Sequence, residues 1–203
     1  MNNDRIEKLT DKFAKLEVES EFNLEKYYKN QEKIIKEILL RPGKEVLTFD
    51  ILDTEKTKNN KLIVLKEKQR QMKIGEIWQE VIGNYDGFIN LRNGHETGLD
   101  ILSKTRKLAI ELKNRTNTDN ASSKKSNFDK LARFKKENPE YKCIYANIND
   151  NNEKKTLKGS KKFIKHNEVD IEHQVGYEFL KFIFEKKTEE IIKFIKCTIE
   201  KYI

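Results

Sequence analysis

Residues 98–116 read Gly-Leu-Asp-Ile-Leu-Ser-Lys-Thr-Arg-Lys-Leu-Ala-Ile-Glu-Leu-Lys-Asn-Arg-Thr, and this stretch decides the fold. It contains two short apolar segments, 99–102 and 108–112, which are joined by a polar turn. The apolar residues of the second segment alternate with other residues, as expected of a strand that buries one face. The stretch therefore predicts a hairpin of two strands.

Two carboxylates and a lysine lie on this hairpin. Asp100 interrupts the first apolar segment, where a lone carboxylate is costly unless it is paired or bound to a metal. Glu111 and Lys113 are two residues apart, so both point to the same side, and the hairpin can bring Asp100 beside them. Two carboxylates suit Mg²⁺, and a neighbouring lysine can orient the attacking water or offset transition-state charge. The pattern favours metal-dependent phosphodiester hydrolysis; the alternative is an exposed hairpin with ordinary surface charges.

Apolar residues at helical spacing predict helices on both sides of the hairpin. The first forty residues show this spacing twice, and Arg41-Pro42-Gly43 ends the second helix. The other predicted helices span 69–84, 128–137, 176–185 and 188–202. The last two helices serve either dimerisation or packing.

Two more strands and two loops complete the expected organisation. Residues 88–91 and 143–148 predict strands, whereas the polar stretches 114–125 and 149–162 predict loops. Helix, short strands, helix and strand in this order are typical of an α/β fold in a single domain, 1–203.

Composition favours a nucleic acid partner without proving one. The 203 residues include 42 Lys and Arg against 34 Asp and Glu, a net charge of +8 that suits a polyanion, although a generally Lys-rich composition explains it as well. Cys143 and Cys197 lack companions at zinc-ligand spacing. No apolar run approaches the ~20 residues that span a bilayer, and the N-terminus has no apolar signal core. We expect a soluble, cytoplasmic protein with no membrane partner and no small-molecule cofactor.

The hairpin and its continuation carry a family resemblance. Residues 98–101 (Gly-Leu-Asp-Ile) and 110–118 (Ile-Glu-Leu-Lys-Asn-Arg-Thr-Asn-Thr) resemble type II restriction endonucleases of the PD-(D/E)XK superfamily. The run onward through 119–125 to Asn138-Pro139 and 145–149 is similar to a subgroup that includes enzymes cutting interrupted GG-N-CC sites. The similarity covers about 72–149, under half of the chain. Leu99 stands where the name of the motif has proline.

The resemblance implies a fold, an activity and a set of site residues. It implies a mixed central sheet flanked by helices, with a helical N-terminal region (1–66), a catalytic core (67–150) and a basic loop with C-terminal helices (151–203). Asp100 and Glu111 would bind Mg²⁺, and Lys113 would position or polarise the attacking water. The substrate would be double-stranded DNA with a short palindromic site, cut by a homodimer.

The helix before the hairpin offers a further acidic residue for the site. Glu76 and Glu80 are the two candidates, and Glu80 lies nearer the edge of the apolar stripe. A solvated glutamate is the alternative for either residue. His95, in the turn before Asp100, is a candidate phosphate contact, although a lone loop histidine is more often simply a surface residue.

A basic, amide-rich segment follows Lys113 directly and is the predicted DNA-facing surface. Residues 113–136 contain eight basic residues against two aspartates, and the segment is dense in Asn, Ser and Thr. Asn and Arg can pair with base edges, while Ser, Thr and Lys suit phosphates. The predicted DNA contacts are Asn114, Arg115, Asn117, Thr118, Asn120, Ser122, Ser123, Lys124 and Lys125. A second Lys-rich stretch, 153–165, is a further phosphate-tracking candidate, although charge runs are usually solvated.

Two other functions fit the same residues. A repair or junction-resolving nuclease could use the same core, but it would need mainly phosphate contacts rather than a segment dense in Asn, Ser and Thr. A non-catalytic DNA-binding module would bind DNA without cutting it. The sequence favours the type II restriction endonuclease over both.

Overall fold

The computed structural model describes residues 22–43, 46–48, 50–92, 94–116 and 120–203. The helix expected within the first 21 residues lies outside these described residues. The helices are α2 (Leu24–Leu40), α3 (Glu55–Gly83), α4 (Ala121–Glu137), α5 (Glu153–Lys158), α6 (Tyr177–Phe184), the short 3-10 helix η1 (Glu185–Lys187) and α7 (Thr188–Tyr202). The strands are β1 (Ile89–Asn90), β2 (Ile101–Ser103), β3 (Leu108–Arg115), β4 (Lys142–Asn149), β5 (Ser160–His166) and β6 (Val169–Val175).

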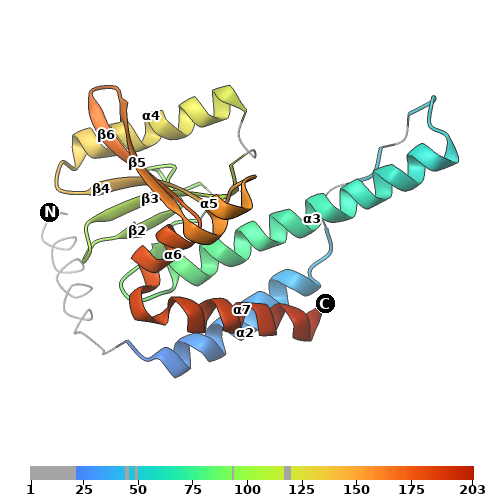
Figure 1. Cartoon of the computed structure of the whole chain (residues 1–203), viewed down its shortest axis with the longest axis horizontal. Coiled ribbons are helices and arrows are strands. Elements are labelled where there is room, and N and C mark those ends of the chain that lie inside the picture. The colour runs from blue at the N-terminus through green and yellow to red at the C-terminus, as the bar shows by residue number, and fades with distance from the viewer. Residues whose placement is uncertain (1–21, 44–45, 49, 93, 117–119) are drawn as a thin grey trace, which may run out of the picture.

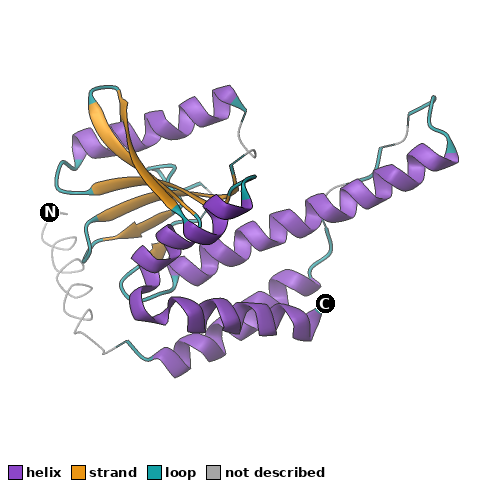
Figure 2. Cartoon of the chain, viewed as in Figure 1, coloured by secondary structure: helices purple, strands orange, loops and turns teal. Residues whose placement is uncertain are grey.

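The strands form one mixed sheet, drawn in orange in Figure 2, and their order in it is β1-β2-β3-β4-β6-β5. β3 pairs in parallel with β4, and β4 with β6, while the other neighbours are antiparallel. The predicted hairpin is the β2–β3 pair, in which Ile101 lies opposite Ile110. α4 makes the crossover that parallel β3 and β4 require. The predicted α/β fold with a mixed sheet flanked by helices is thereby confirmed.

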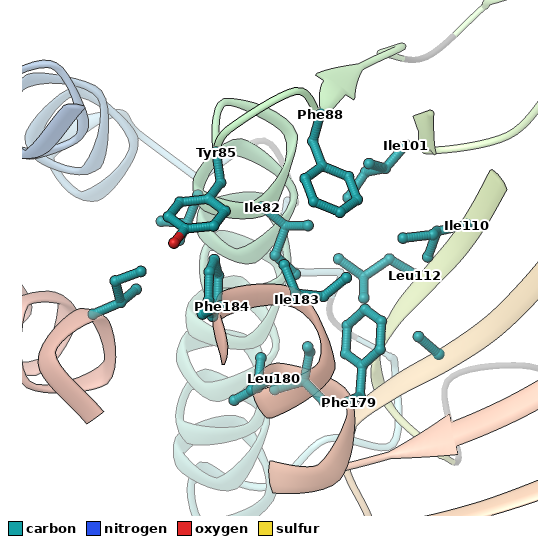
Figure 3. Close-up of a cluster of buried hydrophobic side chains, with 14 of the residues drawn as sticks. Ile82, Tyr85, Phe88, Ile101, Ile110, Leu112, Phe179, Leu180, Ile183 and Phe184 are labelled. Carbon is teal, nitrogen blue, oxygen red and sulfur yellow. The ribbon is translucent and has the colours of Figure 1, made fainter. Parts of the chain in front are cut away.

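Alternation along β3 sends its side chains to two different layers. Ile110 and Leu112 enter a large apolar core shared with α3 and α6, which contribute residues such as Ile82 and Phe179 (Figure 3). Ala109, on the opposite face, belongs to a smaller core formed with α4. Figure 1 shows α4 on one side of the sheet and α3 with α6 on the other. The face under α4 is the one to which Glu111 also points.

The terminal helices form an outer layer against α3 and α6. α2 ends at Leu40, before the predicted stop at Arg41-Pro42-Gly43, and it packs along α7 (Figure 1). The Tyr27 hydroxyl of α2 donates to the Val81 carbonyl of α3 at 2.8 Å, and burial raises the pKa of Tyr27 well above its usual range. α7 thus contributes to packing within the chain, one of its two expected roles. In the described part of the chain, no helix has the length and apolar character needed to cross a membrane.

α3 begins at Glu55, well before the predicted start at 69, and its N-terminal half projects from the body (Figure 1). A capping box explains the start, because the Thr54 and Thr57 side chains and backbones bond reciprocally. The projecting turns lie against little of the core, so they need no continuous apolar stripe. The apolar periodicity that predicted this helix is present only in the part of α3 that packs against the core.

Both predicted loops contain regular structure. β3 continues to Arg115, opposite Asn149 of β4, and α4 begins at Ala121. The stretch 149–162 was expected to be a loop, but it contains α5 and the start of β5, so the region after 150 is not simply a basic loop. β5 is an edge strand whose lysines face solvent, so it has no apolar alternation to mark it.

Candidate active site

The hairpin brings the two predicted metal ligands to the same place. Asp100 lies just before β2 rather than within it, but its backbone N–H still donates to the Ile110 carbonyl at 3.2 Å. Because Ile101 pairs with Ile110, Asp100 falls opposite Glu111. The Asp100 Oδ2 accepts from the backbone N–H of Leu112 at 2.7 Å, which fixes this carboxylate against the edge of β3.

Glu111 is a buried carboxylate with an incomplete set of partners. Its side chain lies at 2% exposure, and Oε1 accepts from Lys113 Nζ at 2.7 Å. Oε2 is also buried, and among the described residues it has no hydrogen-bond partner. Burial and, next, the nearby Asp100 charge raise the pKa of Glu111, while Lys113 and then Lys130 oppose that rise. A cation beside Oε2 would therefore relieve both the desolvation and the repulsion from Asp100.

These residues fit a hard divalent cation such as Mg²⁺. Mg²⁺ is usually bound by one or two carboxylates and keeps several waters or substrate phosphate oxygens. Asp100 and Glu111 supply the two carboxylates, and the buried Oε2 supplies an acceptor that the protein leaves unsatisfied. Within the described ranges, no group of three or more His, Cys, Asp or Glu forms a cage. The two carboxylates would leave most positions around such a cation to waters or phosphate oxygens.

Both glutamates of the helix before the hairpin have other partners within the chain. Glu76 forms an ion pair with Arg41, and the Glu80 Oε2 accepts from Asn84 Nδ2 at 2.9 Å within the same helix. Ile77 and Val81, their neighbours on α3, enter the core on the face of the sheet opposite Glu111. The preference for Glu80 over Glu76 as a third acidic residue gains no support from these contacts.

Three predicted DNA contacts have structural partners within the chain. Asn114 donates from Nδ2 to the Gln71 backbone and side-chain oxygens at 3.1 and 3.0 Å, so its amide faces α3. Arg115 lies 3.5 Å from the Glu67 carboxylate. The Asn120 side chain caps α4 by accepting from the Ser123 N–H at 2.7 Å. Asn117 and Thr118 lie outside the described residues.

The remaining predicted contacts gather at the first turns of α4. Ser122, Lys124 and Lys125 are exposed there, and Ser122 and Lys125 line a groove between α4 and the turn at 96–98. His95 belongs to the same turn, where its Nδ1 lies 2.9 Å from Thr97 Oγ1. The part of the predicted DNA-facing segment from Ala121 onward is thus the start of a helix and not the loop that the polar sequence suggested.

Asn147 and His173 form a polar pair that the sequence did not suggest, on the face of the sheet to which Lys113 points. Asn147 lies beside Lys113 in register, and its Oδ1 lies 2.7 Å from His173 Nε2. Because Asn147 Nδ2 donates to the Arg115 carbonyl at 3.3 Å, its Oδ1 must accept, so His173 carries its proton on Nε2. Burial lowers the pKa of His173 to about 4, which keeps it neutral at neutral pH. Its strand, β6, had no distinctive pattern in the sequence.

Lys130 of α4 belongs to the basic segment 113–136, but the sequence assigned it no role of its own. Its Nζ donates to the Oδ1 of Asn127 at 3.3 Å, and its charge acts on Glu111. Asn127 is buried on α4 in the helical series that continues through Leu131 and Phe134. A polar residue within a buried stripe is the signal that could have marked this pair.

Comparisons with known proteins agree with the geometry. The family model described as Eco47II restriction endonuclease matches residues 1–203. Searches of curated proteins and of solved structures found no match. The match extends well beyond the stretch 72–149 that carries the resemblance in sequence, and it includes both terminal helical regions. The chain belongs to the Eco47II restriction endonuclease family, and it is a DNA-binding endonuclease.

Proposed function

We propose that this protein is a type II restriction endonuclease that hydrolyses both strands of a short DNA site in the cytoplasm with Mg²⁺. Asp100 and Glu111 hold the cation, and Lys113 positions or polarises the attacking water. The observation that carries the proposal is the buried Glu111 carboxylate, repelled by the half-buried Asp100 and left with one oxygen unsatisfied among the described residues. An apo protein would not keep two repelling carboxylates together for stability alone, since each raises the cost of ionising the other.

The chain's own residues have separate tasks in this reaction. When bound, Mg²⁺ supplies positive charge that stabilises the developing charge on the phosphate and on the leaving oxygen. Lys113 Nζ is held at 2.7 Å from Glu111 Oε1, at the rim of the site and partly exposed. From there it can donate to the attacking water and to a phosphate oxygen. The water oxygen bonds to phosphorus and gives up a proton to solvent. The bond between phosphorus and the 3′ oxygen breaks, and this leaving oxygen takes a proton from solvent.

Sequence selectivity of the GGNCC type is the finer part of this proposal. The similarity of residues 72–149 to enzymes cutting such sites supports it. Ser122, Lys124 and Lys125 are exposed at the start of α4, and Ser122 and Lys125 line the groove that also contains Gly98, which supports this part of the proposal. Amide and hydroxyl groups there suit base edges, and lysines suit phosphates.

Cutting both strands requires two active sites, so we include a homodimer with twofold symmetry in the proposal. Large apolar side chains are exposed around the projecting part of α3, as in Ile51 at 98%, Leu52 at 84% and Ile63 and Val64 at 66% each. An apolar surface of this kind on an extended arm suits contact with a second copy of the chain. Sedimentation at micromolar concentration tests it, because a monomer on specific DNA would contradict this part.

Incubation with plasmid and Mg²⁺ tests the activity. The proposal predicts discrete, reproducible fragments that disappear when EDTA replaces Mg²⁺. Indiscriminate or branch-dependent cutting would indicate a repair or junction nuclease instead. Retarded DNA without cutting, from a preparation shown to be folded, would indicate a binding protein and would refute the proposal.

A further inference from the structure

Lys130 lies on α4 beside the active-site hairpin, close enough for its charge to act on Glu111. Its aliphatic stem lies over Gly98, two residues before Asp100: a Cβ at Gly98 would stand 3.3 Å from Lys130 Cδ. Gly98 also has a φ of +64°, so the close approach and the backbone conformation both favour glycine there. The ammonium is therefore placed by packing of its stem and not by a flexible reach from the surface.

The ammonium of Lys130 is short of anionic partners. Its hydrogen bond to a described residue is the 3.3 Å contact with the Asn127 amide oxygen, and the described residues form no salt bridge with it. Asn127 is 6% exposed, so this contact is held firmly. A partly buried ammonium with one neutral acceptor retains two donors for another oxygen.

The surroundings of Lys130 form a basic groove that opens to solvent. Glu96, Thr97 and Gly98 line one side, and Lys125, Lys130 and Arg133 line the other. Asp129 also lines it, but the carboxylate is engaged by His166 Nε2 at 2.7 Å and by Asn167 Nδ2 at 3.0 Å. Three cations against the two carboxylates leave the groove with a net positive charge, which favours an anion there.

We propose that Lys130 is a second catalytic lysine, in addition to Lys113. It donates to an oxygen of the DNA phosphate that enters the groove beside the Asp100–Glu111 pair. This inference rests on the proposed nuclease function and adds a residue to its site. Lys113 and Lys130 would approach the phosphate from the sheet and from α4, so the two lysines divide its negative charge between them. Lys130 also keeps positive charge near Glu111 and so favours its ionised form.

A purely structural role is the competing explanation, in which Lys130 only neutralises Glu111 and Asp100. The two roles predict different salt dependences of DNA affinity. A phosphate contact contributes about 0.9 to the slope of log K against log salt concentration, whereas a neutralising lysine that never touches DNA contributes nothing. A purely neutralising lysine should also matter less once Glu111 is replaced by glutamine.

The test compares Lys130→Met and Lys130→Arg with Lys136→Met, an exposed lysine on the same helix. Binding to duplex DNA is measured in Ca²⁺ over a range of salt, and single-turnover cleavage is measured in Mg²⁺. We expect Lys130→Met to cut about 100-fold more slowly and to lose about 0.9 of slope. Lys130→Arg should retain the slope and part of the rate, and Lys136→Met should match wild type in rate.

Two results would overturn the inference. Cleavage by Lys130→Met within about threefold of Lys136→Met would do so, as would an unchanged salt slope with normal binding. Thermal melting accompanies each variant; if methionine unfolds the protein, Lys130→Gln replaces it in the same comparison. Should wild type itself bind DNA without cutting, the proposed function fails, while the slope still decides whether Lys130 contacts phosphate.

Discussion

Replacing Glu111 by glutamine should stabilise the metal-free protein while abolishing its activity. The carboxylate is 2% exposed, its Oε2 is unsatisfied among the described residues, and Asp100 repels it. An unsatisfied buried polar group costs about 1–3 kcal/mol. The amide removes the repulsion, can still accept from Lys113 and can donate toward Asp100. We expect a gain of about 1 kcal/mol at pH 7, which for a domain of this size raises Tm by about 2–4 °C.

The gain should depend on pH in a defined direction. Because the pKa of Glu111 is raised in the folded state above the 4.5 of an ordinary glutamate, the unfolded chain loses this proton first as pH rises. Stability attributable to Glu111 therefore falls from about pH 4.5 upward through the folded pKa, and it stays reduced above that pKa. Glu111→Gln lacks this loss. The Tm difference between variant and wild type should be near zero at pH 4 and should grow toward pH 7.

The assay is thermal melting in EDTA from pH 4 to pH 8, repeated with Mg²⁺. Glu172 supplies a matched control, because it is equally buried but paired with Lys142 and Lys161 at 2.7 and 2.5 Å. Burial raises the pKa of Glu172, but these lysine hydrogen bonds outweigh it and lower that pKa overall. Wild type therefore gains stability from Glu172 as pH rises, and Glu172→Gln should become less stable than wild type by a margin that grows in the same direction. A Glu111→Gln variant that is less stable than wild type throughout would refute the account, since Glu111 would then be an ordinary partner of Lys113.

Two further predictions concern the lysine of the site and the start of α4. Lys113→Met keeps most of the stem but removes the donors, so single-turnover cleavage should fall about 10²–10³-fold with little change in Tm; a loss under tenfold would remove Lys113 from the site. Lys124→Ala should weaken binding to all sequences and reduce the salt slope by about one unit. Asn120→Ser should keep the α4 cap, so a loss of discrimination between sites in this variant, measured by competition binding, would reveal base reading; unchanged discrimination would leave Asn120 a helix cap alone.

The core of the site could be predicted because it depends on local strand geometry. Alternation places Glu111 and Lys113 on one side of β3, and a short hairpin has few ways to return Asp100 to them. The resulting ion pair at 2.7 Å and the electrostatic effect of Asp100 on Glu111 agree with that prediction. Periodic apolar stripes likewise predicted α6 and α7, which bury one face each.

The sequence could not predict elements that lack an amphipathic pattern of apolar and polar residues. β5 is an exposed edge strand of mostly polar residues, and the first half of α3 projects from the body, so neither has an amphipathic stripe. Long-range contacts were equally hidden. The charge of Lys130 acts on Glu111 only because α4 packs against β3, and Asn114 turns to α3 only because Gln71 lies there. A helix cap such as Asn120 has the same composition as a DNA-reading loop, so polar residues alone do not distinguish them.

Single-turnover cleavage of a DNA of known sequence, by Asp100→Asn and by Glu80→Gln beside wild type, tests the central claim most directly. Asparagine can still accept the 2.7 Å bond from the Leu112 N–H, so the fold should survive while one charge of the metal site is lost. We predict no cleavage by Asp100→Asn, with DNA binding in Ca²⁺ intact or stronger. Glu80→Gln, whose carboxylate contacts Asn84, should cut within about threefold of wild type. Near-normal cutting by Asp100→Asn would contradict the assignment of this hairpin as the catalytic site.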